Sequence, residues 1–501
     1  MRLSQLALLV GGTVVGDDPD VTGTAVDSRA ARPGDLFVAV RGGQHDGRRF
    51  VDHARARGAL AACAESPVAD LPTLVVADPR RALAPLSAAV CGHPAAQLSL
   101  VGITGTLGKT STALLVEAAL GPVPPVGVVG SLGVRVGGRR VDGAEGTAAM
   151  TTPDAPALHR AFRAIVDAGA RTAVMEVTSH ALAQGRVDGL RFALGVFTNL
   201  VPDEHLEFHA TADDYVRTKL RFLDHLAPGA PLVIDHDDAG VAAATRPLGD
   251  RVVGVSLRGD PGAAVVVEYS RADASGTVLA LRLTRALPGL DGRTVGPLAL
   301  PLVLPVFGEP HAANAALAAT TALLAGATPD AVTTAVAALR PIPRRMEVLR
   351  PAAPFVLDDT SGNPRTVAAV FRSLRHVPHA TLRLLFGARG GRGTTINRGL
   401  AEAIAAGALG AGVPVRLVVT TSEGTAAPRD RVTDEERAVV LDTLAGAGVA
   451  FDYEPTLAAA AHRVCDGWAP DDALLVLGAQ AMDGAGALVL ARLDAAGVRE
   501  G

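Results

Sequence analysis

The sequence predicts an α/β protein of three domains: a central domain on a parallel sheet, a small N-terminal α/β domain and a C-terminal Rossmann-like domain. The 501-residue chain is long enough for several cores. Short apolar runs typical of buried strands alternate with Ala-rich helical segments. The pattern changes near residues 98 and 342, so we expect domains at residues 1–98, 99–342 and 343–501.

The N-terminal region is predicted to begin with a helix and a strand. A signal peptide also starts with an apolar stretch, here Leu6 to Val15, but Gly11-Gly12 interrupts it and no small-x-small cleavage site follows. Strand-like runs begin at Asp35 and Leu74, on either side of a helix-like segment from Phe50 to Leu60.

The two larger regions repeat the strand–helix pattern. Residues 265–304 differ, because their turn-punctuated strands suggest an antiparallel flap. Buried-strand runs begin at Leu98, Ala173, Leu194 and Pro231, and again at Phe355, Arg383, Val415 and Ala473.

The composition excludes several classes of partner. A formal charge of −4 with neither sign dominant gives no reason to expect nucleic acid or an anionic membrane surface. No run approaches the roughly 20 apolar residues of a membrane span. The three cysteines have no ligand spacing and are typical of a reducing compartment. We expect a cytoplasmic monomer.

Lysine is almost absent. Of 47 basic residues only Lys109 and Lys219 are lysine, which a GC-rich genome explains. The two exceptions are informative because lysine offers a compact charge and a modifiable amine, and arginine offers neither. We expect both lysines to be chemically required.

Residues 101–110 predict a phosphate-binding loop between a strand and a helix beginning at Ser111. Backbone N–H groups of Gly105, Thr106, Gly108 and Ser111 would converge on phosphate oxygens at a helix N-terminus. Lys109 would reach the β- and γ-phosphates of ATP, and the Thr110 hydroxyl would bind Mg²⁺. The loop departs from the common spacing, since Ile103 stands where the first glycine is usual.

The form Thr104-Gly-Thr-x-Gly-Lys-Thr resembles the loop of the Mur ligases, which add amino acids stepwise to the peptidoglycan precursor. Further motifs match in order, nearest to the family's tripeptide synthetase. They are Asp27-Ser-Arg, Pro33 to Gly42, Thr151-Thr-Pro-Asp, Met175 to Arg186, Phe197-Thr-Asn-Leu, His205, His209, Lys219, Gly308 to Asn314 and Arg345-Met-Glu.

A magnesium site fits these residues. Glu176 ends a buried strand, where a carboxylate is costly unless it meets a cation. His205 stands among three acidic residues, a donor set that suits Mg²⁺. The resemblance implies one Mg²⁺ on Thr110 and Glu176, and a second on Glu176, His205 and a carbamylated Lys219. Lys109, Glu176, His205 and Lys219 are thus the expected catalytic residues.

The resemblance also implies the remaining contacts. Asn314 and Arg345 match positions that contact adenosine, although an interdomain salt bridge explains Arg345 equally well. His209 is expected to be only a capping or packing residue. A carboxylate substrate, UDP-linked in the family, would be bound by Ser28, Thr151, Thr152, Thr178, Gln184 and Arg186; the family usually has serine in place of Thr178.

The C-terminal region departs from the family pattern. Ser422 to Arg429 replaces the Asp-Asn-Pro-Arg motif of the enzymes that add diaminopimelate, and Gly478 to Asp483 replaces a Gly-Lys-Gly-His-Glu segment. Diaminopimelate is therefore not the expected amine. Four charged residues are candidates to bind a new amine, but surface solvation is the expected role of each: Arg389, Arg392, Glu423 and Asp483.

The sequence thus predicts an ATP-dependent ligase that joins an amino acid or amine to a small-molecule carboxylate through an acyl phosphate. Four alternatives stay open: a diverged paralogue acting on a non-UDP carboxylate, a folylpolyglutamate-type or cyanophycin-type ligase, a nucleotide-binding partner subunit, and a simple ATPase or kinase.

Overall fold

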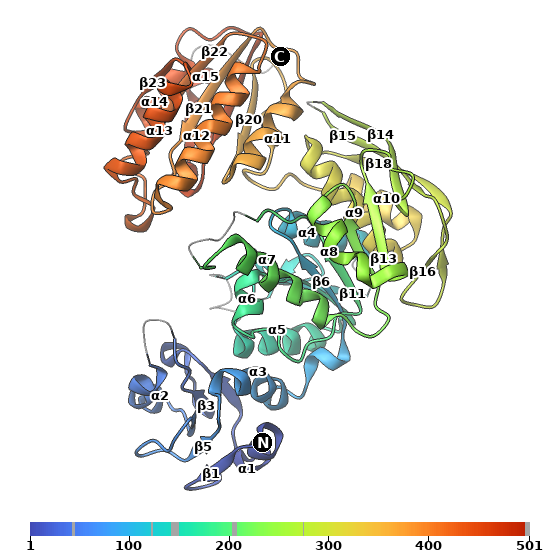
Figure 1. The fold of residues 1–501 in the computed structure, drawn as a ribbon, viewed down its shortest axis with the longest axis vertical. Helices are drawn as coiled ribbons and strands as arrows, with labels where there is room; N and C mark the ends of the chain where they lie inside the picture. Colours follow the sequence, from blue (N-terminus) through green and yellow to red (C-terminus); the bar gives the residue numbers. More distant parts are fainter. Residues whose placement is uncertain (43–45, 122–123, 142–149, 203–207, 274, 496–501) are drawn as a thin grey trace. The chain divides into compact units, whose positions relative to one another are not determined.

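A computed structural model describes residues 1–42, 46–121, 124–141, 150–202, 208–273 and 275–495 of the chain. Within these residues the strands form sheets of five, eleven and six strands and one two-stranded hairpin, and helices alternate with them (Figure 1). The α/β fold class predicted from the sequence is confirmed.

The chain divides into two compact units. The first comprises Met1–Val267, Leu281–Leu300 and Asn314–Ala335, and the second comprises Glu268–Ala280, Pro301–Ala313 and Val336–Gly501. The domain boundaries at residues 98 and 342 stay predictions.

The N-terminal sheet has the strand order β1-β5-β4-β3-β2, and only the pair β1 and β5 is antiparallel. The predicted first helix and strand are present. The expected helix from Phe50 to Leu60 is shorter, because a 3₁₀ turn extends to Phe50 and the backbone leaves the helical conformation before Gly58, whose φ is +101°. The elements are α1 (Leu3–Val10), β1 (Thr13–Val15), β2 (Gly23–Ala25), β3 (Asp35–Val38), α2 (Val51–Ala56), β4 (Ala61–Ala64), β5 (Thr73–Val75) and α3 (Pro79–Val90).

The large sheet has the order β18-β15-β14-β13-β12-β11-β6-β10-β7-β8-β9. Its middle strands are parallel, and β6 lies between β10 and β11. The strands are β6 (Ser99–Thr104), β7 (Val126–Gly130), β8 (Gly133–Val136), β9 (Arg139–Arg140), β10 (Thr172–Glu176), β11 (Leu194–Phe197), β12 (Leu232–Asp235), β13 (Val252–Ser256), β14 (Val265–Asp273), β15 (Gly276–Leu283) and β18 (Leu298–Leu304). The hairpin is β16 (Leu287–Pro288) with β17 (Thr294–Val295).

The helices that follow the parallel strands begin at capping side chains. Thr178 accepts a hydrogen bond from the Ala181 N–H at the start of α6, and Thr211 accepts one from the Asp214 N–H at the start of α7. The helices are α4 (Lys109–Leu120), α5 (Ala155–Asp167), α6 (Ser179–Ala183), α7 (Ala212–Leu220), α8 (Ala239–Thr245), α9 (Glu309–Leu324) and α10 (Pro329–Ala337).

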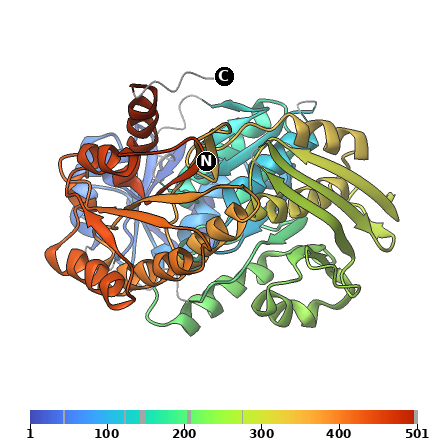
Figure 2. The same ribbon diagram turned by 90° about the horizontal axis from the view of Figure 1, so that it is seen from above.

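The C-terminal sheet has the order β19-β20-β24-β21-β22-β23, with only β19 antiparallel to its neighbour. Helices α11, α12 and α13 pack on one face and α14 and α15 on the other, as Figure 2 shows. The elements are β19 (Glu347–Arg350), β20 (Phe355–Asp359), α11 (Pro364–Leu374), β21 (Thr381–Gly387), α12 (Gly393–Leu409), β22 (Val415–Thr420), α13 (Asp434–Gly446), β23 (Phe451–Tyr453), α14 (Leu457–Cys465), β24 (Asp472–Leu477) and α15 (Ala485–Ala495). This is the predicted doubly wound arrangement.

Across the described part of the chain, none of the helices combines the length and the apolar character that crossing a membrane requires.

Candidate active site

The phosphate loop joins β6 to α4 through two glycines that no other residue can replace without strain. Gly105 and Gly108 have φ angles of +139° and +82°. A β-carbon on Gly105 would stand 1.9 Å from the Thr198 hydroxyl oxygen, and one on Gly108 would stand 2.3 Å from the Asn314 side-chain oxygen. The backbone therefore turns tightly and leaves its N–H groups close to the helix N-terminus, as a phosphate-binding loop requires.

The segment after β11 holds the loop in place. The Asn199 side-chain oxygen accepts a hydrogen bond from the Leu107 N–H at 2.9 Å, and the Thr198 hydroxyl donates to the Leu107 carbonyl at 2.6 Å. The register explains this contact, because Phe197 pairs with Thr104 at the carboxyl ends of the two strands.

Lys109 and Thr110 begin α4, two residues earlier than the predicted helix start. The Lys109 ammonium donates to the carbonyls of Gly105 and Thr106 at 2.9 and 3.0 Å. The Thr110 hydroxyl donates to one oxygen of Glu176 at 2.9 Å. The two side chains thus have different partners. The sequence also predicts different contacts for them, phosphate for Lys109 and Mg²⁺ for Thr110.

Glu176 ends β10 and is only 1% exposed. Burial raises the pKa of this carboxyl, while the Lys109 charge and hydrogen bonds from Ser131 and Thr110 act in the opposite direction. A carboxylate in this position is stabilised by a nearby cation. The oxygen donors of Glu176 and Thr110 are the kind that Mg²⁺ prefers, so the residues fit the ion.

Ser131 is a site residue that the sequence analysis missed. Its backbone N–H donates to Glu176 at 2.8 Å, and its hydroxyl donates to the Thr151 hydroxyl at 3.0 Å. The strand register places it there, because β7 runs parallel to β10 and Val129 pairs with Met175. A β-carbon on Gly130 would stand 2.2 Å from a Glu176 oxygen, so the glycine before Ser131 permits this approach.

The residues expected to bind the carboxylate substrate lie together beyond Glu176. The Thr152 hydroxyl donates to the Glu176 carbonyl at 2.9 Å and lies 3.1 Å from the Thr178 hydroxyl. Arg186 donates to the Thr152 carbonyl at 2.6 Å and to the Gln184 side-chain oxygen at 2.7 Å. Thr152 therefore meets Thr178, Gln184 and Arg186, which come from a second segment of the chain, beside the carboxyl end of β10.

Lys219 lies on α7 and is 1% exposed. Its amine donates to the Gly105 carbonyl at 2.9 Å and stands 5.1 Å from the centre of the Tyr215 ring. Tyr215, also missed from the sequence, shares a 2.7 Å hydrogen bond with the Thr106 hydroxyl. Both lysines of the chain thus reach the carbonyl of Gly105.

Of the expected metal ligands, His205 and its acidic neighbours lie outside the described residues. Within the described part, no three His, Cys, Asp or Glu side chains lie close enough together to hold a metal ion. The second metal position therefore stays a prediction.

The two adenosine candidates belong to different units. Asn314 on α9 lies beside Gly108 and accepts a 3.4 Å hydrogen bond from the Thr112 hydroxyl of α4. Arg345 is exposed and donates to the Thr360 hydroxyl at 2.8 Å. Asn314 is thus placed at the phosphate loop, and Arg345 at the end of β20 in the second unit.

Ser28, in the N-terminal region, is buried and lies 2.9 Å from Nδ1 of His53. His53 on α2 is a further residue that the sequence did not single out. The Asp27 carboxylate caps the short 3₁₀ turn that contains Ser28 and accepts hydrogen bonds from the Arg29 side chain. This turn fixes the direction of the serine hydroxyl.

The carboxyl ends of the C-terminal strands are where a doubly wound domain binds its ligand. Met482 is buried there, and β-carbons on Gly387 and Gly478 would stand 2.5 and 2.8 Å from its side chain. The Ser422 hydroxyl lies 3.3 Å from its sulfur. An apolar side chain therefore occupies the centre of this edge.

The charged residues that the sequence singled out lie on the segments that follow β21, β22 and β24. Asp483 accepts a hydrogen bond from the buried Arg344, and Arg389 donates to the Gly362 carbonyl at 2.6 Å. Glu436 accepts three hydrogen bonds from the backbone N–H groups of residues 391–393, which include Arg392. Glu423 is exposed, and its backbone N–H donates to the Pro455 carbonyl.

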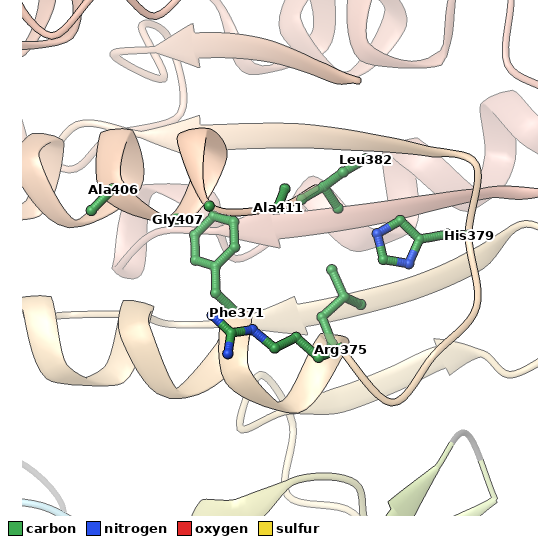
Figure 3. Close-up of a pocket in the computed structure, with 9 residues that line it drawn as sticks. Phe371, Arg375, His379, Leu382, Ala406, Gly407 and Ala411 are labelled. Carbon is green, nitrogen blue, oxygen red and sulfur yellow. The ribbon is translucent and has the colours of Figure 1, made fainter. Parts of the chain in front are cut away.

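A small cavity of about 60 Å³ lies at the opposite end of the same domain, between α11 and α12 (Figure 3). Phe371, Arg375, His379 and Gly407 are among the residues that line it. Ligand pockets usually measure roughly 300 Å³ or more. Because it also lies at the amino end of β21, this cavity is not part of the candidate site.

Comparison with known proteins agrees with this geometry. Residues 20–96 match the domain described as "Mur ligase family, catalytic domain", residues 103–322 the "Mur ligase middle domain" and residues 344–480 the "Mur ligase, glutamate ligase domain". A protein of Streptomyces avermitilis named UDP-N-acetylmuramoyl-L-alanyl-D-glutamate–2,6-diaminopimelate ligase is 33% identical, over 95% of this chain and 91% of its own. A Corynebacterium efficiens protein of the same name is 32% identical, over 95% and 90%.

Solved structures share the fold. A ligase of that same name aligns over 100% of both chains with a TM-score of 0.67 and 22% identity. Folylpolyglutamate synthase of Mycobacterium tuberculosis, solved with ADP and AMPPCP, aligns over 82% of this chain and 94% of its own with a TM-score of 0.60 and 19% identity.

The phosphate loop and these relatives define an ATP-dependent ligase that joins an acid to an amino acid and releases ADP. The chain belongs to the Mur ligase family.

Proposed function

We propose that this ligase activates the carboxylate of a UDP-muramoyl peptide and joins it to an amino acid other than diaminopimelate. The observation that carries the proposal is the continuous contact from Thr110 through Glu176 and Ser131 to Thr151. It links the start of the nucleotide helix to the residues that match the family's carboxylate site. A carboxylate held there would lie next to the γ-phosphate of a bound nucleotide.

In the first step a carboxylate oxygen attacks the γ-phosphorus of ATP, and the bond from that phosphorus to ADP breaks. Lys109 places a positive charge beside the loop, where the β- and γ-phosphates would lie. Arg186, held by Gln184 and Thr152, is the fixed cation available to orient the substrate. The product is an acyl phosphate.

In the second step the amine nitrogen attacks the acyl carbon, the carbon–oxygen bond to phosphate breaks, and the nitrogen loses a proton. The products are an amide and inorganic phosphate. Charge on the phosphoryl oxygens is the main demand of the first step, and in the second step charge develops on the acyl oxygen and on the departing phosphate, so fixed cations at the loop would stabilise both steps.

We further propose that two Mg²⁺ ions bind here, one on Thr110 and Glu176 and one on Glu176, His205 and carbamylated Lys219. Mg²⁺ would neutralise charge on the phosphate oxygens. The burial of Lys219 supports the carbamate, because an amine taken out of water needs compensation and a carbamate turns it into a metal ligand. Ser28, Thr178, Asn314 and Arg345 keep their proposed substrate and nucleotide contacts.

The altered C-terminal edge supports the exclusion of diaminopimelate. Diaminopimelate carries a second amino-acid head group, and charged partners would be needed to recognise it. Here the buried Met482 fills the centre of the edge, and Glu436 already binds the loop before α12. A smaller or less polar amino acid fits this edge better.

The test is an ADP-release assay with UDP-N-acetylmuramoyl-L-alanyl-D-glutamate, ATP and Mg²⁺, run with each amino acid singly and with diaminopimelate. We expect ADP release that depends on an amino acid other than diaminopimelate. Turnover with diaminopimelate alone would refute the amine assignment. Absence of turnover with that UDP compound, but turnover with a non-UDP carboxylate, would refute the carboxylate assignment.

A further inference from the structure

Three side chains form a hydrogen-bonded chain beside the proposed active site. Nε2 of His209 lies 3.0 Å from the Ser179 hydroxyl oxygen, and its Nδ1 lies 3.3 Å from a carboxylate oxygen of Asp214. His209 and Ser179 are 3% and 1% exposed. The histidine is therefore more than the capping or packing residue expected from the sequence.

The chemistry of the three groups determines which atom donates and which accepts in each hydrogen bond. An ionised carboxylate only accepts hydrogen bonds, so the Nδ1–H of His209 donates to Asp214. In the neutral ring Nε2 is then an acceptor, and the Ser179 hydroxyl donates to it. Each member thereby fixes the orientation of the next.

The serine end of the chain is close to the carboxylate site. Ser179 is the first residue of α6 and directly follows Thr178, whose hydroxyl contacts Thr152. Glu176 lies three residues before Ser179, at the end of β10. A fixed Ser179 therefore restrains the turn that carries both Glu176 and Thr178.

The aspartate end of the chain belongs to α7, which reaches the phosphate loop. Tyr215 follows Asp214, and its hydroxyl shares a hydrogen bond with the Thr106 hydroxyl. Lys219 lies further along the same helix and donates to the Gly105 carbonyl. The His209 ring packs edge-on against the Tyr215 ring, with 5.3 Å between centroids. The three hydrogen-bonded side chains thus join α7, which carries Lys219, to the turn that carries Glu176.

We propose that His209 is a positioning residue, which sets Glu176 and Lys219 at the separation needed to bind Mg²⁺ and nucleotide together. The inference rests on the proposed metal roles of those two residues. His209 and Ser179 are too deeply buried to touch a substrate, so they act through the elements they hold.

The experiment measures ADP affinity with and without Mg²⁺ by titration calorimetry on the full chain. The ratio of the two dissociation constants reports how well the side chains that bind Mg²⁺ are placed. The measurement needs no carboxylate substrate. Losing both hydrogen bonds in His209→Phe, or the one to Ser179 in Ser179→Ala, should lower this ratio about threefold to tenfold. Affinity for ADP without Mg²⁺ should stay within about twofold of the unmodified protein's value.

Two further variants separate positioning from packing. In His209→Gln the amide can still bond Ser179, so most of the Mg²⁺ ratio should return, and this variant also serves if His209→Phe does not fold. The double variant His209→Phe/Ser179→Ala should be no worse than His209→Phe, which already lacks both hydrogen bonds. His159→Gln is the matched control, since His159 is buried in α5 and its Nδ1 has no hydrogen-bond partner among the residues that the structure describes.

An unchanged ratio in His209→Phe, or additive losses in the double variant, would overturn the inference. A protein without substitutions that binds ADP equally with and without Mg²⁺ would instead count against the proposed metal site. The proposed substrates are tested separately by turnover, so the failures are distinguishable.

Discussion

A β-carbon on Gly108 would stand 2.3 Å from the side-chain oxygen of Asn314, so the phosphate loop and α9 meet at a position that only glycine allows. Gly108→Ala should displace Asn314 and strain a backbone with a φ angle of +82°. We expect ADP to bind at least about tenfold more weakly, measured by calorimetry. Gly121→Ala is the control, because Gly121 also has a positive φ but, among the described residues other than its chain neighbours, none has an atom within 4 Å of its added β-carbon. Equal affinities of the two variants would contradict the expectation.

Ser131 makes two separable contributions. Its backbone N–H donates to Glu176 at 2.8 Å in any variant, whereas its hydroxyl reaches Thr151 at 3.0 Å and makes only a longer contact of 3.4 Å with Glu176. Ser131→Ala should therefore raise KM for the carboxylate substrate about threefold to tenfold and leave ADP affinity within about twofold. Ser131→Thr keeps the hydroxyl and should restore KM. An unchanged KM in Ser131→Ala would show that the hydroxyl does not contribute to substrate binding.

Lys219→Ala should abolish ligation, because it removes the proposed carbamate. Added short carboxylic acids should restore part of the ADP release, since the small cavity left by the side chain would admit a replacement carboxylate. Lys219→Arg keeps the charge but cannot form a carbamate. Full activity in Lys219→Arg would refute the carbamate.

Asp235 ends β12, and burial, with the charges of Asp237 and Asp238, raises its pKa to about 6. The folded state therefore holds this proton more tightly than the unfolded chain, whose aspartate titrates near 3.8. The contribution of Asp235 to the stability of the wild-type protein should fall as pH rises from about 4 to above 6. Asp235→Asn keeps an acceptor for the Asp237 N–H and should remove this loss, which amounts to about 1–3 kcal/mol at pH 7.

The measurement is the thermal midpoint of both proteins across that pH range. The curves should converge near pH 4 and separate as pH rises, with the variant the more stable protein. A constant difference at all pH values would show that Asp235 does not titrate in the folded protein above its ordinary range.

The elements that the sequence predicted well are those with local signals. Glycines 105 and 108 mark a turn whatever surrounds them, and apolar runs such as Leu194–Phe197 mark buried strands. Glu176 stood out because a carboxylate ends such a run. These features depend on neighbours in the chain, which a sequence displays directly.

Residues whose role depends on strand pairing or on helix packing were not predictable in the same way. Ser131 joins the site only because β7 lies beside β10 in a particular register, and a serine after a strand is otherwise unremarkable in composition. Tyr215 and His209 depend on how α7 packs against the loop and α6. A spacing in sequence does not contain those distances.

The scarcity of lysine gives the protein an unusual chemical simplicity. Besides its N-terminus the chain has two primary amines, one half-buried over the phosphate loop and one almost fully buried beside Gly105. An amine-directed reagent would therefore label Lys109 and the N-terminus and little else, and a Lys-specific protease would have only two peptide bonds to cut. Mass spectrometry on the unaltered protein could follow how ATP protects Lys109 from the reagent, or the two peptide bonds from the protease. No reporter group would have to be placed in the protein.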